Sequence, residues 1–289
     1  MDPRARRREA EEFANQVVER LRPAPDDRPY VVACIRDAYL FEYPPQPLEI
    51  GLSPVGPVYN LTFKGFRQTF NLAQWTNLFF GKNKDAMLAN VTGAHIQLTD
   101  HGLVCMLEMN KVAVLRRAGA GTGRVAAASA AGGGMAAVQQ RTDALGFAKS
   151  IMADKTITTV VAQEDMPYVE AVIVEALMFE PHLGPHMQVS LKVEGHLYNL
   201  IFRGYKSFVN VVRWVNTFLG IHRQPTLSHV IATFVITLPL DEGGDVGIKI
   251  QMNKIEFQKQ EAADDSAEAE SHARVTFKRP AKPVRQGSH

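Results

Sequence analysis

The chain contains 289 residues, 46% of them hydrophobic, and its 32 lysines and arginines nearly balance 30 aspartates and glutamates. This length and apolar content allow one large domain or two ordinary ones. Because the net charge is close to zero, the overall electrostatic field requires neither a nucleic-acid nor a membrane partner, and any basic surface must be local. The two cysteines, Cys34 and Cys105, are too few for a disulfide framework and fit a reducing compartment.

The start of the chain and its hydropathy bear on localisation. Met1 to Arg4 lead into charged sequence and not into the apolar region of a signal peptide. No run approaches the roughly 18 consecutive apolar residues that a membrane-spanning helix needs. We therefore expect a cytoplasmic or nuclear protein with no secretory signal and no membrane partner.

An internal repeat divides the chain. Residues 59–81 return without a gap as residues 198–220, with ten identities over 23 positions. Weaker matches extend it outward on both sides. We predict two duplicated units, 1–117 and 141–260, joined by a flexible Gly/Ala-rich linker at 118–140 and followed by a disordered charged tail at 261–289.

In the first unit, Phe13, Val17 and Leu21 recur every four residues and predict a helix. We read residues 30–42, which match 168–180, as a strand. A three-turn helix is expected at 72–80, because Asn71 stands at its N-cap and Gly81 stands where a left-handed C′ residue would end it.

In the second unit, the same signals are Asn210 and Gly220 around a helix at 211–219. Alternating or β-branched stretches at 189–193, 230–238 and 246–257 predict strands. Each unit thus has the order helix, two to three strands, helix, two strands. The fold class is α+β with mainly antiparallel sheets, and two such units can form a pseudo-twofold arrangement within a monomer or a homo-oligomer.

The strongest candidate site is a strand with alternating basic and aromatic residues that occurs in both units. Such a strand can stack bases and contact phosphates, as in proteins that bind single strands. The alternative is that the aromatic rings belong to the core while the cations face solvent. The candidate nucleic-acid-binding residues are Lys64, Phe66, Arg67, Arg203, Tyr205, Lys206 and Arg213.

A tryptophan and an asparagine in the predicted helix after each basic-aromatic strand are present in both units. Trp75 and Trp214 could stack a base, but each lies within the apolar stripe of its helix and fits a core position. Asn77 and Asn216 lie inside the same helices, where asparagine is mildly unfavourable. Each either bonds a neighbouring loop or contacts a partner.

The sequence predicts no metal and no cofactor. His182 and His186 are four residues apart, but Gly184 and Pro185 oppose a helix that would direct both toward one ion. The glycines of the linker form no phosphate-binding loop, and no nucleophile elbow occurs. A basic run at 278–285 could be a nuclear-localisation or nucleic-acid patch, or a solvated tail.

Several motifs resemble the plant ribosome-inactivating proteins, the rRNA N-glycosidase family. Residues 13–20 are similar to the family's opening helix, and 59–66 or 198–205 to a Tyr-x-x-Gly-Phe-like element. Residues 175–179, Glu-Ala-Leu-Met-Phe, resemble the catalytic Glu-Ala-x-Arg-Phe, with Trp214 downstream where a site tryptophan falls. The resemblance implies ribosomal RNA as substrate and Glu175, Tyr198 and Trp214 as site residues.

The chain departs from this family at Met178, which occupies the position of the arginine that protonates or stabilises the leaving adenine. Methionine has neither a positive charge nor a proton to donate, so an impaired or inactive relative is expected. Our leading hypothesis is therefore a non-enzymatic binding protein for single-stranded nucleic acid. The alternatives are an rRNA N-glycosidase and a protein–protein interaction scaffold.

Overall fold

A computed structural model describes residues 2–42, 48–66, 70–99, 102–119, 134–180, 183, 186–206, 208–237 and 246–256. The first half contains α1 (Pro3–Leu21), α2 (Arg28–Phe41), β1 (Glu49–Val55), β2 (Val58–Phe66), β3 (Phe70–Asn71), α3 (Leu72–Phe80), the 3₁₀ helix η1 (Ala86–Leu88), β4 (Val91–Thr99), β5 (Gly102–Asn110) and α4 (Val112–Gly119). The second half contains α5 (Gly134–Met152), α6 (Lys155–Val160), α7 (Met166–Leu177), β6 (Gln188–Glu194), β7 (Leu197–Arg203), β8 (Phe208–Asn210), α8 (Val211–Leu219), η2 (Pro225–Leu227), β9 (Val230–Thr237) and β10 (Val246–Asn253).

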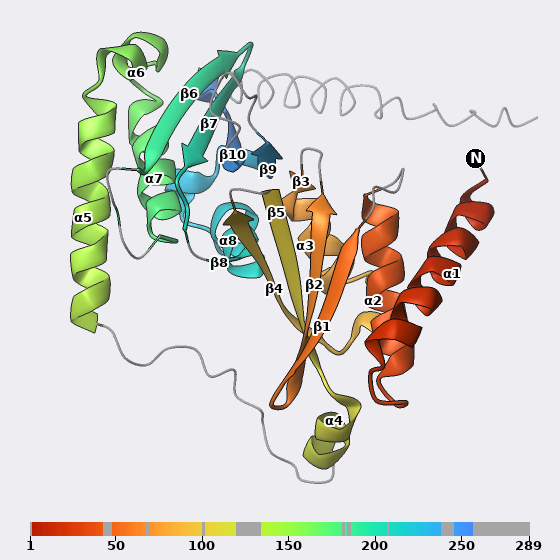
Figure 1. Ribbon diagram of the computed structural model, residues 1–289. Helices are drawn as coiled ribbons and strands as arrows, with labels where there is room; N and C mark the ends of the chain where they lie inside the picture. The colour runs from red at the N-terminus through yellow and green to blue at the C-terminus, as the bar shows by residue number, and fades with distance from the viewer. Residues whose placement is uncertain are drawn as a thin grey trace, which may run out of the picture.

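These elements form an α+β fold with two antiparallel sheets of five strands (Figure 1). The strand orders are β1-β2-β5-β4-β8 and β6-β7-β10-β9-β3. Helices α1 and α2 lie beside the first sheet, and α5 and α7 lie on the opposite side of the molecule (Figure 1). Apart from α4 and α6, the two halves have the same order of elements, whereas their origin by duplication stays a prediction.

Each half contributes one short strand to the sheet of the other half. Strand β3 pairs with β9, and β8 pairs with β4 through residues 208–210. Helices α3 and α8, which directly follow the exchanged strands, pack against each other. The exchange joins the two halves along one seam, the line on which β4 meets β8 and β9 meets β3.

The segment at 30–42, and its match at 168–180, is helical, so the strand prediction was wrong. Helix α2 buries Val31, Cys34 and Ile35 on several sides at once, which removes the amphipathic period that identifies a helix. A proline in the first turn of α2 and of α7 is compatible with helix, because that position lacks an intrahelical partner anyway. Tertiary burial overrides the β preference of the branched residues.

The boundaries of the predicted linker were also wrong. Helix α4 ends at Gly119 and α5 begins at Gly134, so both occupy part of residues 118–140. Residues 120–133 of the predicted linker and the predicted tail at 261–289 lie outside the described residues. Every helix in the described ranges is too short or too polar to cross a membrane.

The caps of α3 and α8 confirm half of the prediction. Asn71 Oδ1 accepts the backbone N–H of Gln74 at 3.0 Å, and Asn210 Oδ1 accepts that of Arg213 at 2.9 Å. Gly81 and Gly220 are not left-handed, however, since their φ angles are −65° and −68°. Glycine is needed there because a Cβ would collide with the carbonyl oxygen four residues earlier.

Trp75 and Trp214 are fully buried at the centre of the two aromatic cores, which confirms the core interpretation. The indole of Trp214 donates from Nε1 to Thr233 Oγ1 at 2.8 Å. The indole Nε1 of Trp75 has no hydrogen-bond partner among the residues that the structure describes. The sequence repeat places Ala94 where the second half has Thr233, so the first half lacks the hydroxyl acceptor.

This difference predicts that removing the hydroxyl group beside Trp214 lowers stability. Adding one beside Trp75 should instead raise stability relative to an apolar residue of similar size. Thr233→Val should lower the free energy of unfolding by roughly 1–3 kcal/mol, because it orphans a buried donor. Ala94→Thr should be more stable than Ala94→Val by about 1 kcal/mol, since both add similar bulk and only threonine can accept from Trp75. Urea unfolding of the four proteins measures both differences. An Ala94→Thr protein no more stable than Ala94→Val would contradict the prediction.

Candidate functional site

The aromatic residues of the predicted nucleic-acid strands are buried. Phe66 and Tyr205 are each 4% exposed, so the expectation that they stack bases was wrong. Phe66 lies edge-on to Trp75 at 5.6 Å between ring centroids, and Tyr205 lies edge-on to Trp214 at 5.9 Å. The Tyr205 hydroxyl also donates to the Ala176 carbonyl at 2.8 Å.

A break in strand alternation explains this burial. Lys64 is exposed, so strict alternation would also expose Phe66. Gly65 between them has a φ of +103°, and the β2–β5 register shifts at this point. The resulting bulge turns Phe66 toward the core. Gly204 repeats the positive φ, at +87°, before Tyr205.

Two of the predicted cations line one pocket, which we call the basic pocket. Its volume is about 330 Å³, and it is lined by Arg203, Lys206 and His186 together with Leu98 and Thr99 from the end of β4. Within the described part of the chain, none of the residues that line it is an aspartate or glutamate. The carboxylate of buried Glu180 contacts the backbone of this segment, since its Oε2 accepts the Lys206 backbone N–H at 3.0 Å.

Arg213 lines a second pocket of about 730 Å³, at the other end of β4, which we call the α8 pocket. Its guanidinium lies over the ring of Phe179, 4.9 Å from the centroid. Arg223 also lines this pocket and is fixed by three carbonyl oxygens, those of Phe218, Ser228 and Val230. Thr92 and Gly93 of β4 complete the wall.

The cations of the first half are not brought to these pockets. Lys64 is the repeat counterpart of Arg203, but it lies on β2 and its Nζ is 3.5 Å from Glu49 Oε1 on β1. Arg67 lies outside the described residues. The structure therefore brings together Arg203 and Lys206, and it places Arg213 at the other pocket along the same strand.

Asn77 and Asn216 occupy equivalent pockets in the two halves. Asn77 is exposed and lines a pocket of about 620 Å³ beside Asp37 and Asp85. Asn216 is exposed and lines the α8 pocket beside Glu175 and Gln224, the counterparts of those two residues. Both asparagines thus face open space, as the interpretation of a partner contact requires.

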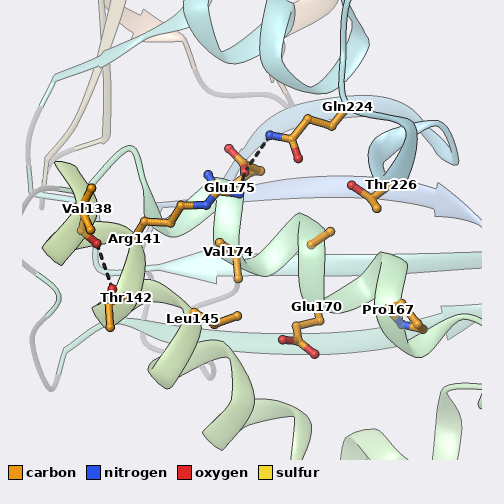
Figure 2. A pocket seen from close by; sticks show the side chains of 11 residues that line it. Val138, Arg141, Thr142, Leu145, Pro167, Glu170, Val174, Glu175, Gln224 and Thr226 are labelled. Atoms are coloured by element: carbon orange, nitrogen blue, oxygen red, sulfur yellow. Dashed lines mark hydrogen bonds and ion pairs between the residues drawn. The ribbon is translucent and has the colours of Figure 1, made fainter. Parts of the chain in front are cut away.

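Glu175 lies between the α8 pocket and a third one, a groove of about 590 Å³ between α5 and α7 (Figure 2). Its Oε1 is 2.8 Å from Arg141 Nη2 and accepts from Gln224 Nε2 at 3.2 Å. The sequence interpretation missed Arg141 and Gln224. In the first half, their counterparts Arg7 and Asp85 contact each other directly as an ion pair, at 3.5 Å.

The other two residues that the N-glycosidase resemblance implied lie away from Glu175. Tyr198 is buried; its hydroxyl donates to Asp165 Oδ2 at 2.8 Å and accepts the Ala162 N–H at 3.1 Å. Burial raises the pKa of Tyr198 to about 12. Trp214 is a core residue. Neither lines a described pocket that contains Glu175.

In the first half, the corresponding position is a network of two arginines and two aspartates. Arg36 donates from Nε to Asp37 at 2.6 Å and from Nη2 to Asp85 at 2.8 Å. Asp85 Oδ1 also accepts the backbone N–H of Met87 at 3.0 Å. Among the described residues there is no group of three or more His, Cys, Asp or Glu side chains able to hold a metal.

The network predicts acid sensitivity. The Met87 N–H, followed by Arg36 and Arg7, lowers the pKa of Asp85. Its stabilisation is therefore fully present above the ordinary pKa of about 4 and is lost as the pH falls through the lowered value of the folded state. Asp85→Asn, which can still cap η1, should lose less stability than the wild type between about pH 5 and about pH 2. Urea unfolding at both pH values measures this, and equal losses would contradict it.

Comparison with known proteins leaves the pockets as the basis for assigning a function. No family model, no curated protein and no solved structure matches this chain. The residues that line the basic pocket and the α8 pocket must therefore carry the functional proposal.

Proposed function

We propose that the protein is a non-enzymatic binding protein for single-stranded nucleic acid, which it contacts through the phosphates. The observation that carries this proposal is that Arg203 and Lys206 line one pocket and Arg213 another, both bordered by β4. The basic character is local, since the chain as a whole has a net charge of only +2. Phosphate contacts depend on such local clusters of arginine and lysine.

The spacing of the two pockets suits a chain of phosphates. Gly93 and Leu98 of β4 line the two pockets, and five residues of strand span roughly 17 Å at about 3.4 Å per residue. One single strand laid along the seam could therefore reach both sets of cations.

The burial of Phe66 and Tyr205 determines whether the protein could recognise the bases of such a ligand. With Phe66 and Tyr205 in the core, these two rings provide no surface on which bases can stack. Contacts to phosphate fix the position of a strand but carry no sequence information. The proposed binding is thus sequence-tolerant and strongly dependent on salt.

A labelled oligonucleotide of about 15 nucleotides tests the proposal by fluorescence anisotropy at several salt concentrations. We expect the double substitution Arg203→Ala and Lys206→Ala to weaken binding and to reduce the slope of log K against log salt by about 1.4, because two phosphate contacts are lost. Lys64→Ala is the matched control, since it removes the repeat counterpart of Arg203 away from the seam. Its affinity and salt slope should equal those of the wild type.

Two results would overturn the proposal. One is absence of binding, or binding that does not change with salt. The other is an equal loss in Lys64→Ala and in the double variant, because contact would then not depend on the pockets along β4.

A second candidate is the rRNA N-glycosidase activity that the family resemblance implies, and one contact favours it. Met178 cannot supply the missing arginine, but Arg141 from α5 places a guanidinium beside the buried carboxylate of Glu175 (Figure 2). A positioned cation of this kind could stabilise or protonate a leaving base, while the carboxylate stabilises positive charge on the sugar.

This candidate is tested by the release of adenine from purified ribosomes. If it is correct, Glu175→Gln should reduce release by about 10²-fold or more, as the loss of a positioned acid–base group does. Glu170→Gln, five residues earlier on α7 and in the same groove, should leave release unchanged. If the unsubstituted protein releases no adenine, the N-glycosidase candidate is removed and the binding function is unaffected.

A further inference from the structure

The groove between α5 and α7 has the form of a docking site for a helix. Two rows of side chains border it, each at the i, i+3, i+4, i+7 spacing of one helical face. Helix α5 presents Val138 and Leu145, with Arg141 and Thr142 between them, and α7 presents the row from Pro167 to Val174 (Figure 2). Val138 is 67% exposed and Leu145 38% exposed, so the apolar part of this groove is open to solvent.

The first half shows what the same groove looks like with charged walls. At the repeat positions of Val138, Leu145 and Val174 it has Arg4, Glu11 and Arg36. Glu11 and Arg36 line a pocket between α1 and α2 that corresponds to the groove. Single exposed apolar residues are ordinary. Here two exposed apolar residues, Val138 and Leu145, lie in one groove with the buried Val174, and all three correspond to charged residues of the sister unit, which indicates a surface that is covered in function.

The charges at the groove specify the partner. Glu175 is neutralised by Arg141 at 2.8 Å. Glu170 lines the groove between Pro167 and Val174, and within the described residues it forms no ion pair. The groove therefore combines apolar walls with one uncompensated negative charge, which is complementary to a partner that has an apolar stripe and a basic residue beside it.

We infer that the α5–α7 groove binds an amphipathic α-helix of another protein, with the apolar face of that helix against Val138, Leu145 and Val174 and a lysine or arginine of it near Glu170. Helix-in-groove recognition uses anchors at i, i+3, i+4 and i+7, which match the two rows of the groove. This groove is separate from the basic pocket and the α8 pocket along the seam. It suits a cationic partner, whereas those two pockets suit the polyanion proposed above.

Two labelled helical peptides of about 18 residues provide the probe, one with leucines on one face and lysines on the other, and one with glutamates replacing the lysines. Fluorescence anisotropy with the full chain should show binding of the Leu/Lys peptide and at least about tenfold weaker binding of the Leu/Glu peptide. Glu170→Lys should reverse this order, because it changes the charge that meets the peptide's polar edge.

Leu145→Glu separates groove binding from nonspecific attraction. It installs the residue found in the sister groove and adds a negative charge, so charge attraction alone predicts tighter binding of the Leu/Lys peptide. Docking in the groove predicts at least about tenfold weaker binding, because a carboxylate would enter the apolar contact. Leu115→Glu is the matched control: Leu115 is 39% exposed, on α4 of the other half. It should bind as the wild type does, and thermal unfolding confirms that both variants fold.

Three outcomes would overturn the inference. The first is no binding of the Leu/Lys peptide. The second is equal behaviour of Leu145→Glu and Leu115→Glu. The third is binding only after residues 257–289 are deleted, which would identify the occupant as the C-terminal segment of this chain and not another protein.

Discussion

The reciprocal exchange of β3 and β8 is the constraint on which the rest of the structure depends. Each strand is two or three residues long and would be too short to hold a sheet edge by itself. Each is anchored because Asn71 or Asn210 ends the strand and also caps the following helix. Strand, cap and helix thus form one unit, which closes an edge of the partner sheet and brings α3 against α8.

The exchange also creates the sites. Both pockets of the basic seam have one wall from β4 of the first half and the remaining walls mainly from the second half. Neither pocket would exist in an isolated half. A function at the seam therefore requires both halves in one assembly, even though most of the cations come from the second.

The sequence predicted the parts of the fold that depend on local chemistry. The asparagine caps, the buried tryptophans and the antiparallel strands follow from side-chain hydrogen bonds and from periodicity, which a single segment contains. Helices α2 and α7 could not be predicted in this way, because residues such as Val31 and Ile35 are buried on all sides and have β-branched side chains. The partners of β3 and β8 could not be predicted either, since a two-residue strand contains no information about a sheet in the other half.

The candidate site shows the same limit. The sequence left open whether Phe66 is exposed for stacking or belongs to the core, and the burial of its ring depends on the bulge at Gly65. Arg141 was missed because the repeat is faint in the first helix, although its counterpart Arg7 forms a similar ion pair. The sequence does not show that α5, α7 and η2 lie close together. Only this proximity brings Arg141, Glu175 and Gln224 together as a polar cluster.

The two halves differ in the residues that line their helical grooves. Core and capping positions are shared, as in Trp75 and Trp214, or Asn71 and Asn210. Around the shared frame, the first half fills its helical groove with charge and ties Arg36 to two aspartates. The second half has Val174 in place of that arginine, and its cations line the pockets along β4, although Lys64 of the first half corresponds to Arg203. The binding proposed above would therefore use side chains of the second half, while β4 of the first half supplies one wall of each pocket.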